Sequence, residues 1–315
     1  MNILFRADSS SNIGTGHIMR DLVLAQKYAK KGDHIIFATQ ELKGNINHKI
    51  LEANYDLTIL KSNNIKEIDK LIKDFKIDMI VIDHYGIDYK YEKKLKINHS
   101  NLRILSFDDT YEKHYCDILL NHNISANKKK YKDLVPKECE LRCGSKYTLL
   151  RDEFIKEKKR LKNKKQLSSL KSKLTTGNIF GCSIFIAMGG TDHSNINIKI
   201  LKVLKKFTNL EVNLVTTIAN EHLKELKKYC KNKPWIKLHI NSNKIAKLMN
   251  KSNFAIVTPS VTVNEVYFMK LPFIAIKTAD NQVDMYEYLR KKKYLVLKEF
   301  NTKKLEKKII LICKI

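Results

Sequence analysis

The sequence has little of what several classes of protein require. Only 7 of its 60 basic residues are arginines, it has 4 prolines and 10 glycines in 315 residues, and no apolar run approaches the length of a membrane helix, about 20 residues. The six cysteines form no C-x-x-C pair, so we predict reduced thiols and no disulfide framework. Arg6 and Asp8 interrupt the apolar stretch that a signal peptide would need. These absences favour a soluble, cytoplasmic protein with no membrane partner.

Positive charge is the feature that the sequence has in excess. The formal net charge is +27, and lysines spread along the chain supply most of it. Such charge can neutralise phosphates, but specific nucleic-acid recognition relies on the planar fork of arginine. We therefore interpret the charge as a composition bias that gives a solvated basic surface, and we predict no nucleic-acid partner. The alternative is a basic nucleic-acid-binding protein that keeps an inactive enzyme fold.

Length and hydrophobic content together indicate folded domains. At about 150 residues per domain, a chain of this length is expected to form two. Hydrophobic residues make up 43% of it, which excludes disorder for most of the chain.

Short apolar runs alternate with helical patterns in the first half of the chain. A strand is predicted over Asn2–Ala7, a helix over Ile18–Lys31 and a second strand over His34–Thr39, which together form a βαβ unit. Repeated units of this kind predict a parallel sheet covered by helices on both faces. Further strands are predicted near Leu57–Leu60, Met79–Ile82, Leu102–Phe107 and Asp117–Leu120, with a helix over Ile65–Phe75.

A lysine-rich stretch separates this series from a second one. Residues 156–180 are predicted as a linker or insertion between Rossmann-like domains at 1–155 and 181–315, and Glu299–Ile315 is a basic amphipathic tail of no assigned role. The second series has strands near Ile184–Met188, Val212–Thr216, Ile236–Ile240, Phe254–Thr258 and Phe273–Lys277, and helices over Glu221–Cys230, Lys244–Lys251 and Asp284–Lys292.

The loop after the first strand is polar and contains glycine. Gly14 and Gly16 permit a close backbone approach to a ligand, and His17 falls at the start of a helix, where the helix dipole disfavours the imidazolium. His17 is therefore a candidate base, or alternatively a helix cap. Met19 stands where a nicotinamide-binding G-x-G-x-x-G loop would need glycine, and the P-loop pattern is also missing, so a dehydrogenase and a P-loop kinase are disfavoured.

Other strand ends carry further candidate residues. Asp83 and Tyr85 follow the fourth strand and Asp108-Asp109 follow the fifth, where they could bind sugar hydroxyls or orient a base; a turn or cap is the alternative for the last pair. Gly189-Gly190 follows a strand of the second half, and its amides suit a diphosphate. The Cys, His and carboxylate spacings match no metal motif, so no metal is expected.

A later segment resembles a known family. The stretch Thr258-Pro259-Ser260 to Glu265, together with the N-terminal Gly-Thr-Gly-His, is similar to the MurG-like nucleotide-sugar enzymes of the GT-B fold. This resemblance implies two Rossmann-like parallel-sheet domains that face a central cleft, with Ser260 and Glu265 on UDP.

A narrower resemblance covers nearly the whole chain. ILFRADSSSNIGTGHIMRDL, IDHYG, LSFDD, CDILLNHN, RCGSKYTLLRDEF, AMGGTD, IAKLMN and the NE and NQ pairs resemble the PseG family of UDP-sugar hydrolases of pseudaminic acid biosynthesis. The resemblance implies cleavage of UDP-2,4-diacetamido-2,4,6-trideoxy-β-L-altropyranose, with inverting attack of water at C1. We also expect a monomer that needs no cofactor. A MurG-like glycosyltransferase is the alternative. His17 is then the base, Tyr85 and Asn281 complete the active site, and substrate or UDP binding is expected for Arg151, Ser260, Glu265, Gly189, Gly190, Gly14, Gly16, Gln282 and Asp83.

Overall fold

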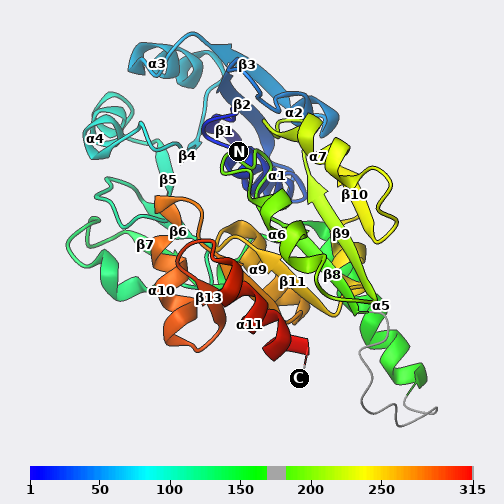
Figure 1. Cartoon of the computed structure of the whole chain (residues 1–315). Coiled ribbons are helices and arrows are strands. Elements are labelled where there is room, and N and C mark those ends of the chain that lie inside the picture. Colours follow the sequence, from blue (N-terminus) through cyan, green and yellow to red (C-terminus); the bar gives the residue numbers. More distant parts are fainter. Residues whose placement is uncertain (169–181, 314–315) are drawn as a thin grey trace. The chain divides into compact units, whose positions relative to one another are not determined.

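The chain folds as two units, Met1–Leu149 and Leu150–Ile315, each built on its own parallel sheet (Figure 1). The computed structural model describes residues 1–168 and 182–313. The predicted α/β class with two Rossmann-like parallel-sheet domains is confirmed. Within the described ranges, no helix is both long and apolar enough to cross a membrane.

The division between the units differs from the expected one. It follows Leu149, whereas the sequence placed it after residue 155 and expected a linker at 156–180. Helix α5 (Asp152–Ser168) begins directly after the division and packs on α8 (Ile245–Asn250) of the second unit. Glu153 of α5 accepts a hydrogen bond, at 3.1 Å, from a backbone N–H in the first turn of α8. The first part of the lysine-rich stretch is therefore a helix of the second unit; residues 169–180 lie outside the described residues.

The sheet of the first unit has seven parallel strands in the order β3-β2-β1-β4-β5-β6-β7. The sequence predicted the first six; the seventh is an edge strand whose sequence, ELRC, has no apolar run. The strands are β1 (Asn2–Ala7), β2 (His34–Gln40), β3 (Asp56–Leu60), β4 (Met79–Asp83), β5 (Arg103–Phe107), β6 (Ile118–Asn121) and β7 (Glu140–Cys143).

Helices cover both faces of this sheet because alternate strand residues point to opposite sides. Ile3 and Phe5 of β1 belong to a core shared with α1, whereas Leu4 between them belongs to a second core shared with α3 and α4. Each core is closed by the apolar side of its helices. The helices are α1 (Gly16–Ala29), α2 (His48–Glu52), α3 (Ile65–Asp74) and α4 (Tyr89–Asn98), with the short turns η1 (Lys128–Tyr131) and η2 (Ser145–Tyr147).

The second unit has six parallel strands in the order β10-β9-β8-β11-β12-β13. They are β8 (Cys182–Ala187), β9 (Leu210–Thr216), β10 (Ile236–Ile240), β11 (Phe254–Val257), β12 (Phe273–Ile276) and β13 (Leu295–Leu297). Besides α5 and α8, its helices are α6 (Ile196–Leu204), α7 (Leu223–Cys230), α9 (Val261–Met269), α10 (Val283–Lys291), α11 (Thr302–Cys313) and the turn η3 (Asp280–Gln282).

The basic tail is part of the core of the second unit. Its residues 302–313 form α11, which buries Leu305, Ile309 and Ile312 in the same apolar cluster as α6 and the strands. The period of these positions, four and then three residues, places them on one side of the helix, and the lysines between them point outward.

Each sheet has one point at which its strand order reverses. In the first unit it lies between β1 and β4, and in the second between β8 and β11. Ligands of open parallel sheets bind beyond the carboxyl ends of the strands at such a point. Asp83 ends β4, His17 begins the helix that follows β1, and Gly189 and Ser260 lie in the loops after β8 and β11. The topology therefore brings most of the predicted site residues to two places.

Candidate active site

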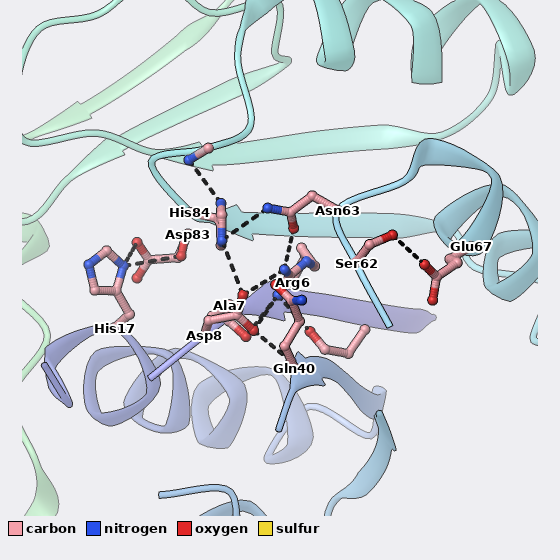
Figure 2. Close-up of polar contacts among 12 residues, drawn as sticks. Arg6, Ala7, Asp8, His17, Gln40, Ser62, Asn63, Glu67, Asp83 and His84 are labelled. Carbon is pink, nitrogen blue, oxygen red and sulfur yellow. Dashed lines mark hydrogen bonds and ion pairs between the residues drawn. The ribbon is translucent and has the colours of Figure 1, made fainter. Parts of the chain in front are cut away.

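His17 and Asp83 form a hydrogen-bonded pair at the switch point of the first unit (Figure 2). His17 is the second residue of α1, and Asp83 is the last residue of β4. His17 Nδ1 lies 2.7 Å from Asp83 Oδ1 and 3.1 Å from the Asp83 carbonyl oxygen. Because both partners are acceptors, Nδ1 must carry the proton. The neutral ring therefore presents an unprotonated Nε2, the atom that a general base needs.

The Asp83 carboxylate is buried and fully engaged. It is 1% exposed, and Arg20 binds both of its oxygens, donating from Nε to Oδ2 at 2.5 Å and from Nη2 to Oδ1. Burial alone would raise the pKa of Asp83, but the charges and hydrogen bonds of Arg20 and His17 hold that pKa well below its usual range. Asp83 is thus a buried anion that orients the His17 ring. Its predicted contact with substrate and its predicted orientation of a base both stay predictions.

Asp21 adds a second buried carboxyl beside this pair. It follows Arg20 on α1 and is completely buried. Burial, and then the negative charge of Asp83, raise the pKa of Asp21 well above its usual range, against the opposing effect of Arg20. Next to the one guanidinium, a negative charge is therefore favoured on Asp83 over Asp21.

The aromatic rings of Tyr85 and His17 contact each other in a T-shaped arrangement. The two ring centroids are 5.0 Å apart at an interplanar angle of 84°, and the Tyr85 hydroxyl donates to Asp109 Oδ1 at 2.9 Å. Tyr85 nevertheless stays 54% exposed, so its ring is available to a ligand. The neighbouring Asp108 accepts from the backbone N–H groups of Thr110 and Glu112, which is the turn role that the sequence left open for it.

A second buried arginine fixes the loop that carries Tyr85. Arg6 donates from two nitrogens to both oxygens of Asp8, each at 2.7 Å (Figure 2). Asp8 lies 3.1 Å from His84 Nε2, and His84 Nδ1 accepts from the Gly86 N–H at 2.9 Å. Nδ1 is therefore the acceptor and Nε2 the donor of His84, so the residues before and after Tyr85 are both held by hydrogen bonds.

The two glycines of the first loop, Gly14 and Gly16, differ in backbone conformation and position. Gly14 has a φ of +86°, a conformation that favours glycine, and its N–H donates to the carbonyl of Ser10 at 2.9 Å. Gly16 is the first residue of α1, and a Cβ atom at either glycine would meet no other atom within 4 Å. Open space at both positions fits a loop that a ligand approaches closely.

In the second unit, the predicted diphosphate loop follows β8. Gly189 has a φ of +90°, and the Gly190 carbonyl accepts from Thr217 Oγ1 at 2.9 Å. A Cβ atom at Gly190 would lie 3.0 Å from that threonine side chain, whereas the space at Gly189 is open. Five residues separate the glycine pair from α6, and Asp192 among them accepts from the Ile196 N–H at 2.9 Å, so the loop is not a direct strand-to-helix turn.

Arg151 and Glu265 pair with each other within the second unit. Arg151 Nη2 donates to Glu265 Oε1 at 3.0 Å, and Nη1 lies 2.7 Å from Glu153 Oε1. Glu265 is the fifth residue of α9. Burial raises the pKa of Glu265, although the charge and hydrogen bond of Arg151 oppose that effect. Ser260 stands directly before α9, with its Oγ 2.9 Å from Thr258 Oγ1.

Asn281 and Gln282 have different surroundings in η3. Asn281 is exposed, whereas Gln282 is buried and its Oε1 accepts from the Thr278 N–H at 2.8 Å. The Ala279 N–H donates to the same oxygen at 3.3 Å. Gln282 thus organises the loop that carries Asn281. The predicted contact of Gln282 with substrate stays a prediction.

The sequence reasoning missed the two arginines, Arg6 and Arg20. One signal for Arg20 was available, because His17, Arg20 and Asp21 are spaced three and four residues apart and so share one side of α1. Among the described residues, no group of three or more His, Cys, Asp or Glu side chains could hold a metal ion.

The two parallel sheets, each reversing its strand order once, give the chain a fold of the GT-B class. MurG of Acinetobacter baumannii covers 99% of this chain at a TM-score of 0.63 and 11% identity, with 90% of MurG matched. The UDP-GlcNAc 2-epimerase of Neisseria meningitidis covers 98% at a TM-score of 0.62 and 14% identity, with 91% of the epimerase matched. At such identities the likeness shows the fold alone.

The sequence comparison defines the family. The UDP-2,4-diacetamido-2,4,6-trideoxy-beta-L-altropyranose hydrolase of Campylobacter jejuni is 42% identical over 296 residues, which are 94% of this chain and 98% of the relative. The chain belongs to the family of this hydrolase. The uncharacterized protein MJ1062 of Methanocaldococcus jannaschii is 31% identical over 300 residues, 92% of this chain and 59% of that relative. No family model matches the sequence.

Proposed function

We propose that this protein hydrolyses UDP-2,4-diacetamido-2,4,6-trideoxy-β-L-altropyranose to UDP and the free sugar. The observation that carries the proposal is the His17–Asp83 pair, which presents Nε2 as a base, in a chain 42% identical to the hydrolase named above. The working form we propose is a cytoplasmic monomer that needs no cofactor.

The reaction begins with the attack of a water molecule that loses a proton. His17 Nε2 accepts that proton while the water oxygen attacks C1 of the sugar from the side opposite the diphosphate. The bond from C1 to the diphosphate oxygen breaks, its electron pair leaves with UDP, and the configuration at C1 inverts. Asp83 stabilises the imidazolium that forms, because its negative charge lies 2.7 Å from Nδ1. Tyr85 and Asn281 are proposed to orient the acetamido sugar and the water.

The nucleotide is assigned to the second unit. The N–H groups of Gly189 and Gly190 are proposed to bind the diphosphate, and Ser260 with Glu265 the nucleotide. Glu265 is suited to ribose hydroxyls because Arg151 holds only its Oε1 in the structure. Arg151 itself has two carboxylate partners, so a diphosphate would have to share or replace one of them.

The test is release of UDP from this nucleotide sugar in chelator-treated buffer without an acceptor. We expect the wild type to release UDP and His17→Ala to lose nearly all of the activity. His34→Ala is the matched control, since His34 also pairs with an aspartate in the first unit but is exposed. Release only after an acceptor hydroxyl is added would favour the glycosyltransferase alternative, and no release in either condition would reject both enzymes.

A further inference from the structure

One guanidinium connects the two parts of the first-unit site. Arg20 lies one helical turn after His17 on α1 and donates to both oxygens of Asp83 through Nε and Nη2. Its third nitrogen, Nη1, donates to Asp109 Oδ2 at 3.2 Å. The two carboxylates come from the ends of neighbouring strands, β4 and β5. Each carboxylate in turn accepts a hydrogen bond from one of the proposed active-site rings.

The contacts of Arg20 with the two carboxylates depend on the planar guanidinium of arginine. The side chain of Arg20 is buried, and its guanidinium carbon lies 4.9 Å from the centroid of the Phe107 ring. A planar fork can bind one carboxylate with two nitrogens and a second with the third, whereas the ammonium of lysine is a single point of charge. The guanidinium plane therefore fixes the angle between Asp83 and Asp109.

Two chains of contacts begin at this guanidinium. The first runs from Arg20 through Asp83 to His17 Nδ1, the last step being 2.7 Å. The second runs from Arg20 through Asp109 to the Tyr85 hydroxyl, the last step being 2.9 Å. The rings of Tyr85 and His17 then meet edge to face, which closes the circuit. A displacement of Arg20 would thus move both rings relative to one another.

We propose that Arg20 is a positioning residue that sets the geometry of His17 through Asp83 and of Tyr85 through Asp109. It touches no reacting atom; it holds the carboxylates that hold the rings. This inference rests on the proposed function, because the geometry matters for turnover only if His17 and Tyr85 act on the sugar.

The kinetic test uses Arg20→Lys, Asp109→Asn and Tyr85→Phe. Arg20→Lys is expected to lower kcat by about 100-fold with little change in KM, since small misplacements of reacting groups cost rate and the nucleotide is assigned to the other unit. Asp109→Asn has one side-chain oxygen for two donors, so it should lower kcat by about 10-fold. In the Tyr85→Phe background the same Asp109→Asn change should have almost no further effect, because the hydroxyl it positions is already gone.

A spectroscopic readout separates this inference from the proposed function. Nitrogen-15 correlation spectra of the histidine rings report which His17 nitrogen carries the proton, with no substrate present. The wild type should show the Nδ1 proton, and Arg20→Lys a mixture of tautomers. Arg142→Lys is the matched control, because Arg142 makes a bidentate pair with Glu140 in the same unit at an exposed edge.

The outcomes are distinct. If the wild type releases no UDP, the proposed function fails, and the tautomer spectra alone decide the role of Arg20. If Arg20→Lys does not fold, Asp109→Asn, whose side chain is partly exposed, carries the test. Wild-type kcat and an unchanged His17 tautomer in the folded variants would overturn the proposal, as would equal effects of Asp109→Asn with and without the Tyr85 hydroxyl.

Discussion

Asp83 receives a hydrogen bond from His17 at 2.7 Å while both of its oxygens are bound by Arg20. The negative charge of Asp83 therefore lies on the Nδ1 side of the imidazole ring, opposite Nε2. This relationship ties the protonation state of one buried carboxyl to the direction in which the base presents its lone pair.

Asp83→Asn should lower kcat by about 10²- to 10⁴-fold with the fold intact. An asparagine can donate from its amide to Nδ1, which would place the ring proton on Nε2 and remove the base. Steady-state UDP release measures the effect. Asp56→Asn is the control, since Asp56 binds exposed His34 in the same unit. A variant that retains a tenth or more of the wild-type kcat would contradict the role of Asp83.

Glu265→Gln should weaken binding of UDP by about 10-fold, because a charged acceptor makes stronger hydrogen bonds than a neutral amide. Calorimetric titration with UDP measures this, with Glu211→Gln as control, since the Glu211 side chain is 45% exposed in the same unit. Since burial raises the pKa of Glu265, the affinity should also fall as the pH decreases and this carboxyl gains a proton. Equal affinities of wild type and Glu265→Gln would remove the nucleotide role from this residue.

The buried pair of His114 and Glu92 should make stability depend on pH. His114 Nδ1 lies 2.8 Å from Glu92 Oε1; burial alone would lower the pKa of His114, but the hydrogen bond and charge of Glu92 outweigh it and raise that pKa above 6.5. The folded state then holds the proton more tightly than the unfolded state. The contribution is complete below pH 6.5 and is lost as the pH rises through the raised pKa.

Urea unfolding of the wild type and of His114→Gln across pH 5 to 9, a range of about four units around the ordinary histidine pKa, tests this. The difference in unfolding free energy between the two proteins should shrink with rising pH. A difference that stays constant, or grows, would show that the proton of His114 is not bound more tightly in the folded state.

Leu305→Ala in α11 should destabilise the second unit by about 2–5 kcal/mol, because Leu305 is 0% exposed and its removal leaves a cavity. Leu311→Ala in the same helix is the control, since Leu311 is 50% exposed, and it should change stability by less than about 0.5 kcal/mol. Denaturant unfolding of both variants gives the comparison. Similar losses in the two would mean that α11 does not pack as described.

The sequence predicted the parts of the fold that depend on long buried runs. The strands at both switch points, such as NILFRA in β1 and CSIFIA in β8, are apolar because helices cover them on both sides. Two edge strands were missed, since β13 has only three residues and β7 carries charged ones; the other two, β3 and β10, were predicted. The tail was read as amphipathic but without a role, because the period of its apolar residues does not say which surface they will cover.

The sequence analysis selected His17, Asp83 and Tyr85 for the candidate site but missed the two buried arginines. His17, Asp83 and Tyr85 follow strand ends next to glycine-containing loops, which is a pattern that a sequence can show. Arg6 and Arg20 cannot be found in this way, since a buried arginine and a surface arginine look alike until their carboxylate partners are known. The partners of Arg20 lie far away in the chain: Asp83 and Asp109 are 63 and 89 residues from it.

The packing of α11 determines the order in which the two units can fold during synthesis on the ribosome. Every strand of the first sheet lies within residues 1–149, so this unit can complete its hydrogen-bonded sheet while the remainder of the chain is still being synthesised. The second unit cannot complete its apolar core until Ile309 and Ile312 have left the exit tunnel of the ribosome, because both residues belong to that core. The unit that carries His17 is therefore expected to fold first, and the second unit only after Ile312 has been synthesised and has left the ribosome.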